Sequence, residues 1–230
     1  MSETNYENKT ISTNVQKKIS RAVAKLNFNR ADQFYKGGVN YGSVSLTVGD
    51  VNDTSTNSAT SNALGNYSKL NSNFSRFQRL TDQNALQVNL SAQYAFKNLD
   101  SGDKFRLGGP YGIRAYPNSE GQGDHGLMVN IELKHGFTQA LEGMVFYDWG
   151  WIQQHQNTYS SWNSSNVNQK NIYQLQGMGV GATLNVNPTT TINWNFSTTL
   201  GSNKGEDASG LENDGLSKDK RSYLSITSRF

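Results

Sequence analysis

Apolar and polar residues alternate along most of this chain, so that every second side chain is hydrophobic in run after run. The clearest run spans residues 192–200, where Ile192, Trp194 and Phe196 alternate with asparagine, serine and threonine. Residues 86–96 follow the same period. Because successive side chains of a strand point to opposite faces, this pattern predicts strands with one apolar and one polar face.

The alternation predicts an all-β, antiparallel protein of about ten strands. The predicted strands span residues 10–18, 22–32, 37–49, 68–80, 84–97, 127–137, 141–153, 171–186, 190–200 and 222–230. Several of them are longer than the common strand of about 5–6 residues, and they suit a tilted membrane crossing of about 9–11 residues. A soluble β-sandwich would produce the same alternation, because each of its sheets also has one buried face.

The connections between the predicted strands favour a membrane barrel over a sandwich. Short turns alternate with long polar loops along the chain. The short turns lie near 81–84, 138–140 and 187–189, and the long loops near 50–67, 98–126, 154–170 and 201–221. Short turns at one end and long loops at the other are typical of outer-membrane barrels.

Composition narrows the possible functions. The chain has 230 residues, is 34% hydrophobic and 11% aromatic, and contains no cysteine, which excludes disulfides, thiol catalysis and cysteine-based metal sites. The formal net charge is +3 with acidic and basic residues interspersed, so no nucleic-acid-binding surface is predicted. The sequence contains no run of 18 apolar residues, so no transmembrane helix is predicted. A membrane β-barrel would still be compatible with this, because its apolar residues alternate with polar ones.

The residues that usually carry catalysis do not form a recognisable set. His125, His135 and His155 lie far apart and lack metal-ligand spacing. Neither a phosphate-binding loop nor a Ser/His/Asp arrangement occurs in a recognisable frame. We therefore expect no enzymatic activity, no metal and no cofactor.

One long glycine-rich segment, residues 105–120, carries Arg114 between an isoleucine and an alanine–tyrosine pair. A loop this long between two regular strands is uncommon unless it is functional or disordered. Ile113, Tyr111 and Tyr116 argue against disorder, because disordered segments are poor in β-branched and aromatic residues. We expect this loop to fold onto the rest of the protein.

Strand parity suggests a partner for Arg114. In the strand 141–153, Val145 and Tyr147 point to one face, so that Phe146 and Asp148 point to the other. A carboxylate facing lipid would be strongly disfavoured, which places Asp148 on the inner face of a barrel. A guanidinium and a carboxylate match as a bidentate fork, and we expect Arg114 to pair with Asp148 inside the lumen.

The next predicted strand supplies a surface for this loop. Gly177, Gly179 and Gly181 alternate with Met178 and Val180, so the three glycines share the inner face with Asp148. Glycine within a strand often marks the close approach of another backbone. We expect the three glycines to form a smooth floor beneath the loop that carries Arg114.

These motifs occur together and in order, and the chain from about Val39 to Phe230 resembles the two-partner secretion transporters, the TpsB family. The matching residues are the loop motif Ile113, Arg114, Ala115 and Tyr116, the partner-strand motif Phe146 and Asp148, Glu132 and Leu133 between them, and the terminal aromatic Phe230. In such proteins the loop motif folds into the lumen, and a terminal aromatic residue is read by the barrel-assembly machinery. Alanine stands at position 115 where the motif more often has glycine, which is a minor departure.

The resemblance implies a transmembrane β-barrel in the outer membrane of a Gram-negative bacterium. Residues 1–230 would form its C-terminal barrel portion, about ten strands of a sixteen-stranded family barrel, without the POTRA domains and plug helix of family members. The implied function is secretion of a large TpsA-type exoprotein, an adhesin, haemolysin or contact-dependent toxin. Lipid and the barrel-assembly machinery are the further implied partners. A passive porin, a surface adhesin barrel and a barrel-assembly factor remain alternatives.

Overall fold

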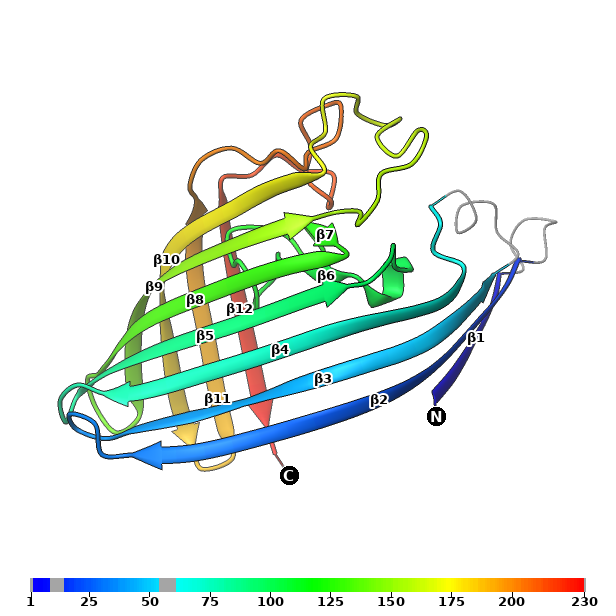
Figure 1. Cartoon of the computed structure of the whole chain (residues 1–230). Coiled ribbons are helices and arrows are strands. Elements are labelled where there is room, and N and C mark those ends of the chain that lie inside the picture. Colours follow the sequence, from blue (N-terminus) through cyan, green and yellow to red (C-terminus); the bar gives the residue numbers. More distant parts are fainter. Residues whose placement is uncertain (1, 9–14, 54–60, 230) are drawn as a thin grey trace.

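The computed structural model describes residues 2–8, 15–53 and 61–229, and the described chain is almost entirely β-structure (Figure 1). Ten of its strands form one sheet: β1 Ser2–Asn8, β2 Val15–Asp32, β3 Gly38–Asp53, β4 Gly65–Arg79, β5 Asn84–Ala95, β8 His125–Gly136, β9 Leu141–Gln153, β10 Ile172–Asn187, β11 Thr190–Thr199 and β12 Lys220–Ser228. A short 3-10 turn, η1 Ser101–Asp103, and a two-residue ribbon, β6 Phe105–Arg106 with β7 Gln122–Gly123, lie between β5 and β8.

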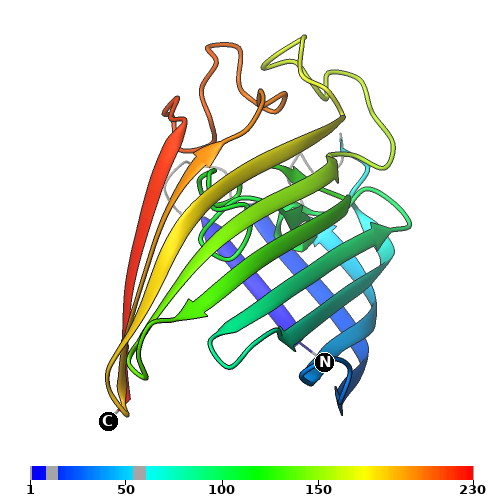
Figure 2. The same cartoon turned by 90° about the vertical axis from the view of Figure 1, so that its left-hand side faces the viewer.

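Every neighbouring pair in the large sheet is antiparallel, and the strands follow one another in chain order from β1 to β12. The sheet curls so that its two ends come round toward each other (Figures 1 and 2). Among the described residues no pairing joins β1 to β12, so the curl is not closed by hydrogen bonds. The structure confirms the predicted all-β, antiparallel class.

The predicted strand bounds are correct to a few residues from β3 onward, but the N-terminal strands differ from the prediction. A single strand, β2, runs through residues 15–32, where the sequence pattern predicted one strand ending at 18 and another beginning at 22. The first part of the predicted strand 10–18 lies outside the described residues. The strand β1, at residues 2–8, was not predicted.

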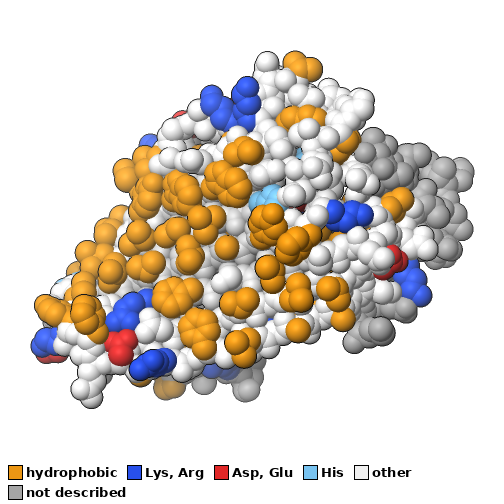
Figure 3. All heavy atoms as spheres, viewed as in Figure 1, with side chains coloured by type: hydrophobic (Ala, Val, Ile, Leu, Met, Phe, Trp, Pro, Cys, Tyr) orange, Lys and Arg blue, Asp and Glu red, His pale blue; other side chains and the backbone are white. Residues whose placement is uncertain are grey.

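The outer face of the sheet is apolar and the inner face is polar or covered. In β9, Val145 is 53% exposed, whereas the next residue on the opposite face, Phe146, is 5% exposed. The same parity continues in β3 and β8, and Figure 3 shows hydrophobic side chains spread in a broad band over this face. A band of this kind on a curled antiparallel sheet matches the lipid-facing surface of an outer-membrane protein.

Membrane-spanning helices were searched for separately among the described residues. No helix there is both long enough and apolar enough to cross a bilayer.

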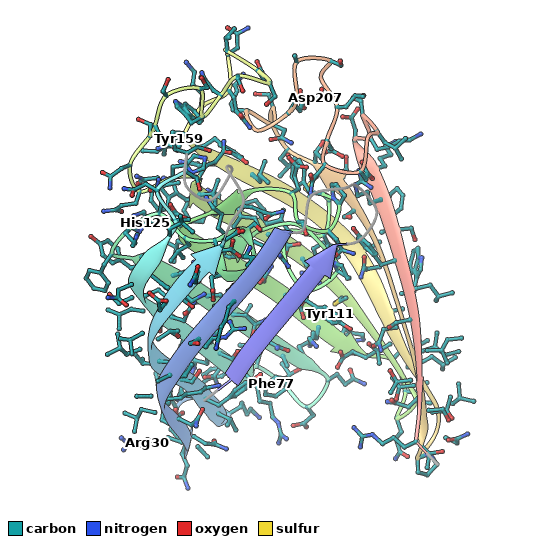
Figure 4. All side chains as sticks on the ribbon, turned by 90° about the vertical axis from the view of Figure 1, so that its right-hand side faces the viewer. Arg30, Phe77, Tyr111, His125, Tyr159 and Asp207 are labelled. Atoms are coloured by element: carbon teal, nitrogen blue, oxygen red, sulfur yellow. The ribbon has the colours of Figure 1, made fainter. Side chains whose placement is uncertain are left out.

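The connection from β5 to β8, residues 96–124, lies on the concave face of the sheet, and we refer to it as the inner loop (Figure 4). Its apolar side chains pack on the inner faces of β8, β9 and β10. This buried cluster consists of Leu107, Ile113, Ala115, Tyr116, Met128, Ile152, Tyr173 and Leu175. Among the described residues, buried apolar side chains thus gather where the inner loop covers the sheet.

Candidate site around Arg114

The inner loop is a compact folded segment that makes its own hydrogen bonds. Its two limbs approach each other at β6 and β7, and the Leu107 amide continues the pairing by donating to the Gly121 carbonyl at 3.1 Å. Beyond this point the chain turns back, and the Ile113 amide donates to the Leu107 carbonyl at 2.8 Å. A side chain at Gly112 would lie 1.9 Å from that same carbonyl oxygen, so the turn requires glycine. This fold presents Arg114 to the sheet.

The sheet surface beneath Arg114 consists of two adjacent rows of inward-facing residues. One row runs from Asn130 on β8 through Asp148 on β9 to Gly177 on β10. The other row runs across β8, β9, β10 and β11 and consists of Glu132, Phe146, Gly179 and Ser197. Register alone thus gathers a carboxylate pair, an aromatic ring, an amide and a hydroxyl in one patch.

Arg114 binds Asp148 through a bidentate fork. Its Nε donates to Asp148 Oδ2 at 2.9 Å and its Nη2 donates to Oδ1 at 2.8 Å. The Arg114 backbone amide also donates to Oδ2, at 3.0 Å. Asp148 is fully buried and Arg114 is 5% exposed, so the attraction is screened little by solvent. The structure thus places the two predicted partners in direct contact.

Two further groups contact the guanidinium. Its Nη1 donates to Glu132 Oε1 at 2.7 Å, and the guanidinium carbon lies 3.5 Å from the centre of the Phe146 ring. A planar guanidinium stacks well on an aromatic face, and this arrangement leaves its edges available for carboxylates. Phe146 therefore orients Arg114, and Glu132 supplies a second negative charge.

Two residues that sequence reasoning did not single out complete the site. Asn130 donates to Asp148 Oδ1 at 2.8 Å and to the Gly112 carbonyl at 2.9 Å, which joins the sheet carboxylate to the loop backbone. Ser197 donates to the Arg114 carbonyl at 2.7 Å. Both lie on polar, inward-facing positions of predicted strands, but the alternation could not distinguish them from the other polar residues there.

The three predicted glycines differ in what they contact. A side-chain carbon at Gly177 would lie 2.6 Å from the Ala115 side chain, so the inner loop rests directly on this glycine. At Gly179 the nearest side chain is the Phe146 ring, at 2.5 Å, and at Gly181 it is Met144, at 2.4 Å. The glycines of β10 thus accommodate the loop at one position and neighbouring side chains of β9 at two.

The other residues of the loop motif lie at the tip of the inner loop, by which we mean residues 111–116. Ile113 and Ala115 are fully buried in the cluster on β8–β10, and Tyr116 is almost fully buried beside them. The Tyr116 carbonyl accepts a hydrogen bond from the Tyr223 hydroxyl on β12 at 2.9 Å. Phe230, the predicted assembly signal, lies outside the described residues.

The loop 154–171, which connects β9 to β10, contacts the end of the inner loop at Asp124. Asp124 accepts a hydrogen bond from the Gln156 amide at 2.8 Å and forms an ion pair with Lys104 at 3.2 Å. Burial lowers the pKa of Lys104, although Asp124 acts in the opposite direction. Burial and then the nearby Lys104 ammonium lower the pKa of His155 to about 4, so this imidazole is neutral near pH 7. His155 therefore adds no charge where the loop 154–171 packs on the inner loop.

The Arg114 site consists of ion pairs and hydrogen bonds between a loop and a sheet. Among the described residues no group of three or more histidine, cysteine, aspartate or glutamate side chains is placed to bind a metal. Its contacts instead fasten a loop to a sheet through buried charge-assisted hydrogen bonds, which are about twice as strong as neutral ones. The geometry is that of an attachment between two parts of one chain.

An apolar outer face, a polar inner face and an inward-folded loop fastened to the wall define the outer-membrane barrel class of proteins. The sequence profile of the haemolysin secretion/activation proteins ShlB, FhaC and HecB matches residues 4–184. The chain belongs to this family, a family of transport proteins in the outer membrane of Gram-negative bacteria.

Individual relatives agree with this assignment. The heme/hemopexin transporter protein HuxB of Haemophilus influenzae strain 86-028NP is 30% identical over 156 residues, which cover 64% of this chain and 27% of HuxB. HuxB of strain ATCC 51907 / DSM 11121 / KW20 / Rd is 32% identical over 118 residues, or 50% of this chain and 20% of that protein. The chain therefore matches about a quarter of the length of these relatives.

Solved structures show the same fold. CdiB from Escherichia coli superimposes with a TM-score of 0.56 at 10% identity, over 97% of this chain and 48% of CdiB. BamA from Haemophilus ducreyi lacking POTRA domains 1-3 gives a TM-score of 0.53 at 12% identity, over 96% of this chain and 57% of that one. At these identities the likeness concerns the fold alone.

Proposed function

We propose that this chain is the C-terminal barrel portion of a two-partner secretion translocator, which passes a large TpsA-type exoprotein across the outer membrane. Membership of the haemolysin secretion/activation family supports this function. The single structural observation that carries the proposal is the buried fork between Arg114 and Asp148. It fastens a 29-residue connection, residues 96–124, inside the curl of the sheet, where a channel would otherwise lie.

In this proposal the Arg114 site holds the pore in a transport-competent shape. Breaking a buried ion pair by removing one partner costs about 3–5 kcal/mol, because the other charge is left uncompensated. Such an energy is large enough to keep the loop attached, yet small enough for binding of cargo to offset it. Lipid around the apolar band and the barrel-assembly machinery are the other partners that this function requires.

Secretion of the exoprotein tests the proposal directly. The full-length transporter that carries this chain is produced together with a large TpsA-type exoprotein, and the secreted exoprotein is measured in the medium. We expect Arg114→Ala and Asp148→Ala to reduce secretion by more than about tenfold, since each loses well over the 1.4 kcal/mol that corresponds to one decade. Arg106→Ala is the matched control, because Arg106 lies in the same loop but is exposed.

Insertion of each variant is checked by its heat-modifiable migration in gels, so that a loss of secretion is not a loss of protein. Normal secretion by both Arg114→Ala and Asp148→Ala would refute the proposed role of the site. A large, steady conductance in planar bilayers, with no dependence on an exoprotein, would instead indicate a passive porin.

A further inference from the structure

The first limb of the inner loop contacts a different part of the sheet from the tip. Residues 98–104, which we call the leading segment, lie against the inner faces of β2 and β4. The tip, by contrast, is bound by β8, β9 and β11. In the order of the sheet these two groups of strands are separated by β5. The inner loop therefore reaches across the concave face of the sheet, from β2 and β4 to β8, β9 and β11 (Figure 4).

Asp103 is the centre of the contacts made by the leading segment. Its carboxylate accepts a hydrogen bond from the Tyr67 hydroxyl at 2.9 Å and lies 3.2 Å from Arg21 Nη1 and 3.1 Å from Lys69 Nζ. Lys69 also donates to the Asp103 carbonyl at 2.6 Å. The Asp103 side chain is only 3% exposed, so one carboxylate with three side-chain partners is withdrawn from water. We call this set of four residues the Asp103 anchor.

Neighbouring residues reinforce the Asp103 anchor. Asp100 caps the 3-10 turn η1 by accepting from the Gly102 amide at 3.0 Å, and it forms an ion pair with Lys17 of β2. Gln93 of β5 donates to the Asp103 carbonyl at 3.2 Å. A separate apolar cluster packs Leu99 of the leading segment against the sheet; its other members are Ile19, Val51, Tyr67 and Ala95.

The charges explain why the leading segment lies against β2 and β4. Lys17, Arg21 and Lys69 bring three positive charges to neighbouring inward positions of β2 and β4, and the leading segment supplies two carboxylates. Without the segment, Arg21 and Lys69 would lose the carboxylate of Asp103 that lies between them, and Lys17 would lose Asp100. Among the described residues the two buried apolar clusters share no residue, so apolar packing does not tie this attachment to the Arg114 site.

We propose that Asp103 is a positioning residue that fastens the leading segment to β2 and β4 independently of the Arg114 site. The inner loop is then attached to the sheet at two separate places, the Asp103 anchor on β2 and β4 and the Arg114 site on β8 and β9. Breaking the Arg114 site frees the tip, whereas the leading segment stays in place. The role of two independent attachments rests on the proposed translocator function, because a pore must keep its cross-section while the tip of the inner loop moves.

Spin labels on each part of the loop test this independence without any cargo. The chain contains no cysteine, so Ser101→Cys and Tyr111→Cys each give a single label within it, and both positions are exposed. Label mobility is measured by electron paramagnetic resonance in the full-length protein reconstituted in lipid vesicles. The two perturbations are Asp103→Asn and Arg114→Gln.

We expect Asp103→Asn to shorten the rotational correlation time at position 101 by at least about threefold and to leave position 111 unchanged. Arg114→Gln should do the reverse. Asp82→Asn is the matched control, because Asp82 lies exposed in the β4–β5 turn and the chemical change is the same. The proposal is overturned if Asp103→Asn leaves position 101 unchanged, or if it frees position 111 as much as Arg114→Gln does.

A second variant decides the matter if Asp103→Asn does not insert into the membrane. Tyr67→Phe removes one hydrogen bond from the Asp103 anchor and changes no charge. A smaller rise in mobility at position 101 alone supports the proposal, and an unchanged label there overturns it. Because these readings need no exoprotein, normal secretion by both Arg114→Ala and Asp148→Ala would refute the proposed role of the Arg114 site and leave the Asp103 result standing.

Discussion

The substitution Asp148→Asn tests the Arg114 site most sharply, because it keeps the size of the side chain and changes only its acceptors. Each carboxylate oxygen of Asp148 accepts two hydrogen bonds. Oδ2 accepts from the backbone amide and Nε of Arg114, and Oδ1 accepts from Arg114 Nη2 and from Asn130 Nδ2. An asparagine has one oxygen and one NH2 group, so in either orientation two donors would face a donor.

The structure sets the size of the expected effect. Two charge-assisted hydrogen bonds are lost, each contributing about 1.5–3 kcal/mol, which gives about 3–6 kcal/mol in all. Asp148 is fully buried, so solvent does not replace these bonds. Glu132 still binds Arg114 Nη1, which favours the lower end of this range. At 1.4 kcal/mol per decade, about 3 kcal/mol raises the population of detached loop about a hundredfold.

Hydrogen–deuterium exchange measures this population, since the Arg114 amide is itself bonded to Asp148. We expect the peptide that covers residues 113–116 to exchange about a hundredfold faster in Asp148→Asn, with β2–β4 unchanged. Asp82→Asn, in an exposed turn, is the control. Exchange within about twofold of the unmodified protein, in a variant that inserts normally, would show that Asp148 does not hold the loop.

Two further substitutions perturb the same site by other means. Gly177→Val places a side chain where the Ala115 side chain would be only 2.6 Å from the new carbon, so we expect the tip to detach and secretion to fall. Gly136→Val, with its nearest atom at 3.8 Å, should leave both unchanged in the same exchange and secretion assays. Tyr223→Phe removes the hydrogen bond to Tyr116 and should weaken tip attachment by about 1 kcal/mol, seen as a several-fold faster exchange at 113–116. An effect of Tyr223→Phe as large as that of Asp148→Asn would contradict this ranking.

Much of the Arg114 site could be predicted because strand geometry is local. Successive side chains of a strand alternate between faces as a consequence of backbone pleating, so the position of Asp148 on the inner face follows from Val145 and Tyr147 on the outer one. A buried carboxylate needs a cationic partner, and Arg114 lies in a long glycine-rich loop two strands earlier in the chain. Together with the assumption of a membrane barrel, these facts predict the contact between Arg114 and Asp148.

The N-terminal strands show where local pattern misleads. The sequence suggested a break at residues 19–21, but β2 passes through them without interruption. Its inner face carries Ile19 between Lys17 and Arg21, so the expected polar face is mixed at this point. The structure gives the reason, since Ile19 packs under the leading segment while the two cations pair with its carboxylates. A residue that contacts the loop need not obey the pattern of a residue that faces water.

By itself, the sequence determined the alternating strands, the inner face that carries Asp148 and the presence of a folded loop with Arg114. Only the tertiary structure decided that Asn130 and Ser197 reach the loop, and that Asp103 binds Arg21 of β2, which lies 82 residues earlier in the chain. The physical reason is that alternation is set by the covalent geometry of neighbouring residues. Which of many equivalent polar side chains meets the loop depends on the path of the loop through space, and no local period encodes that path.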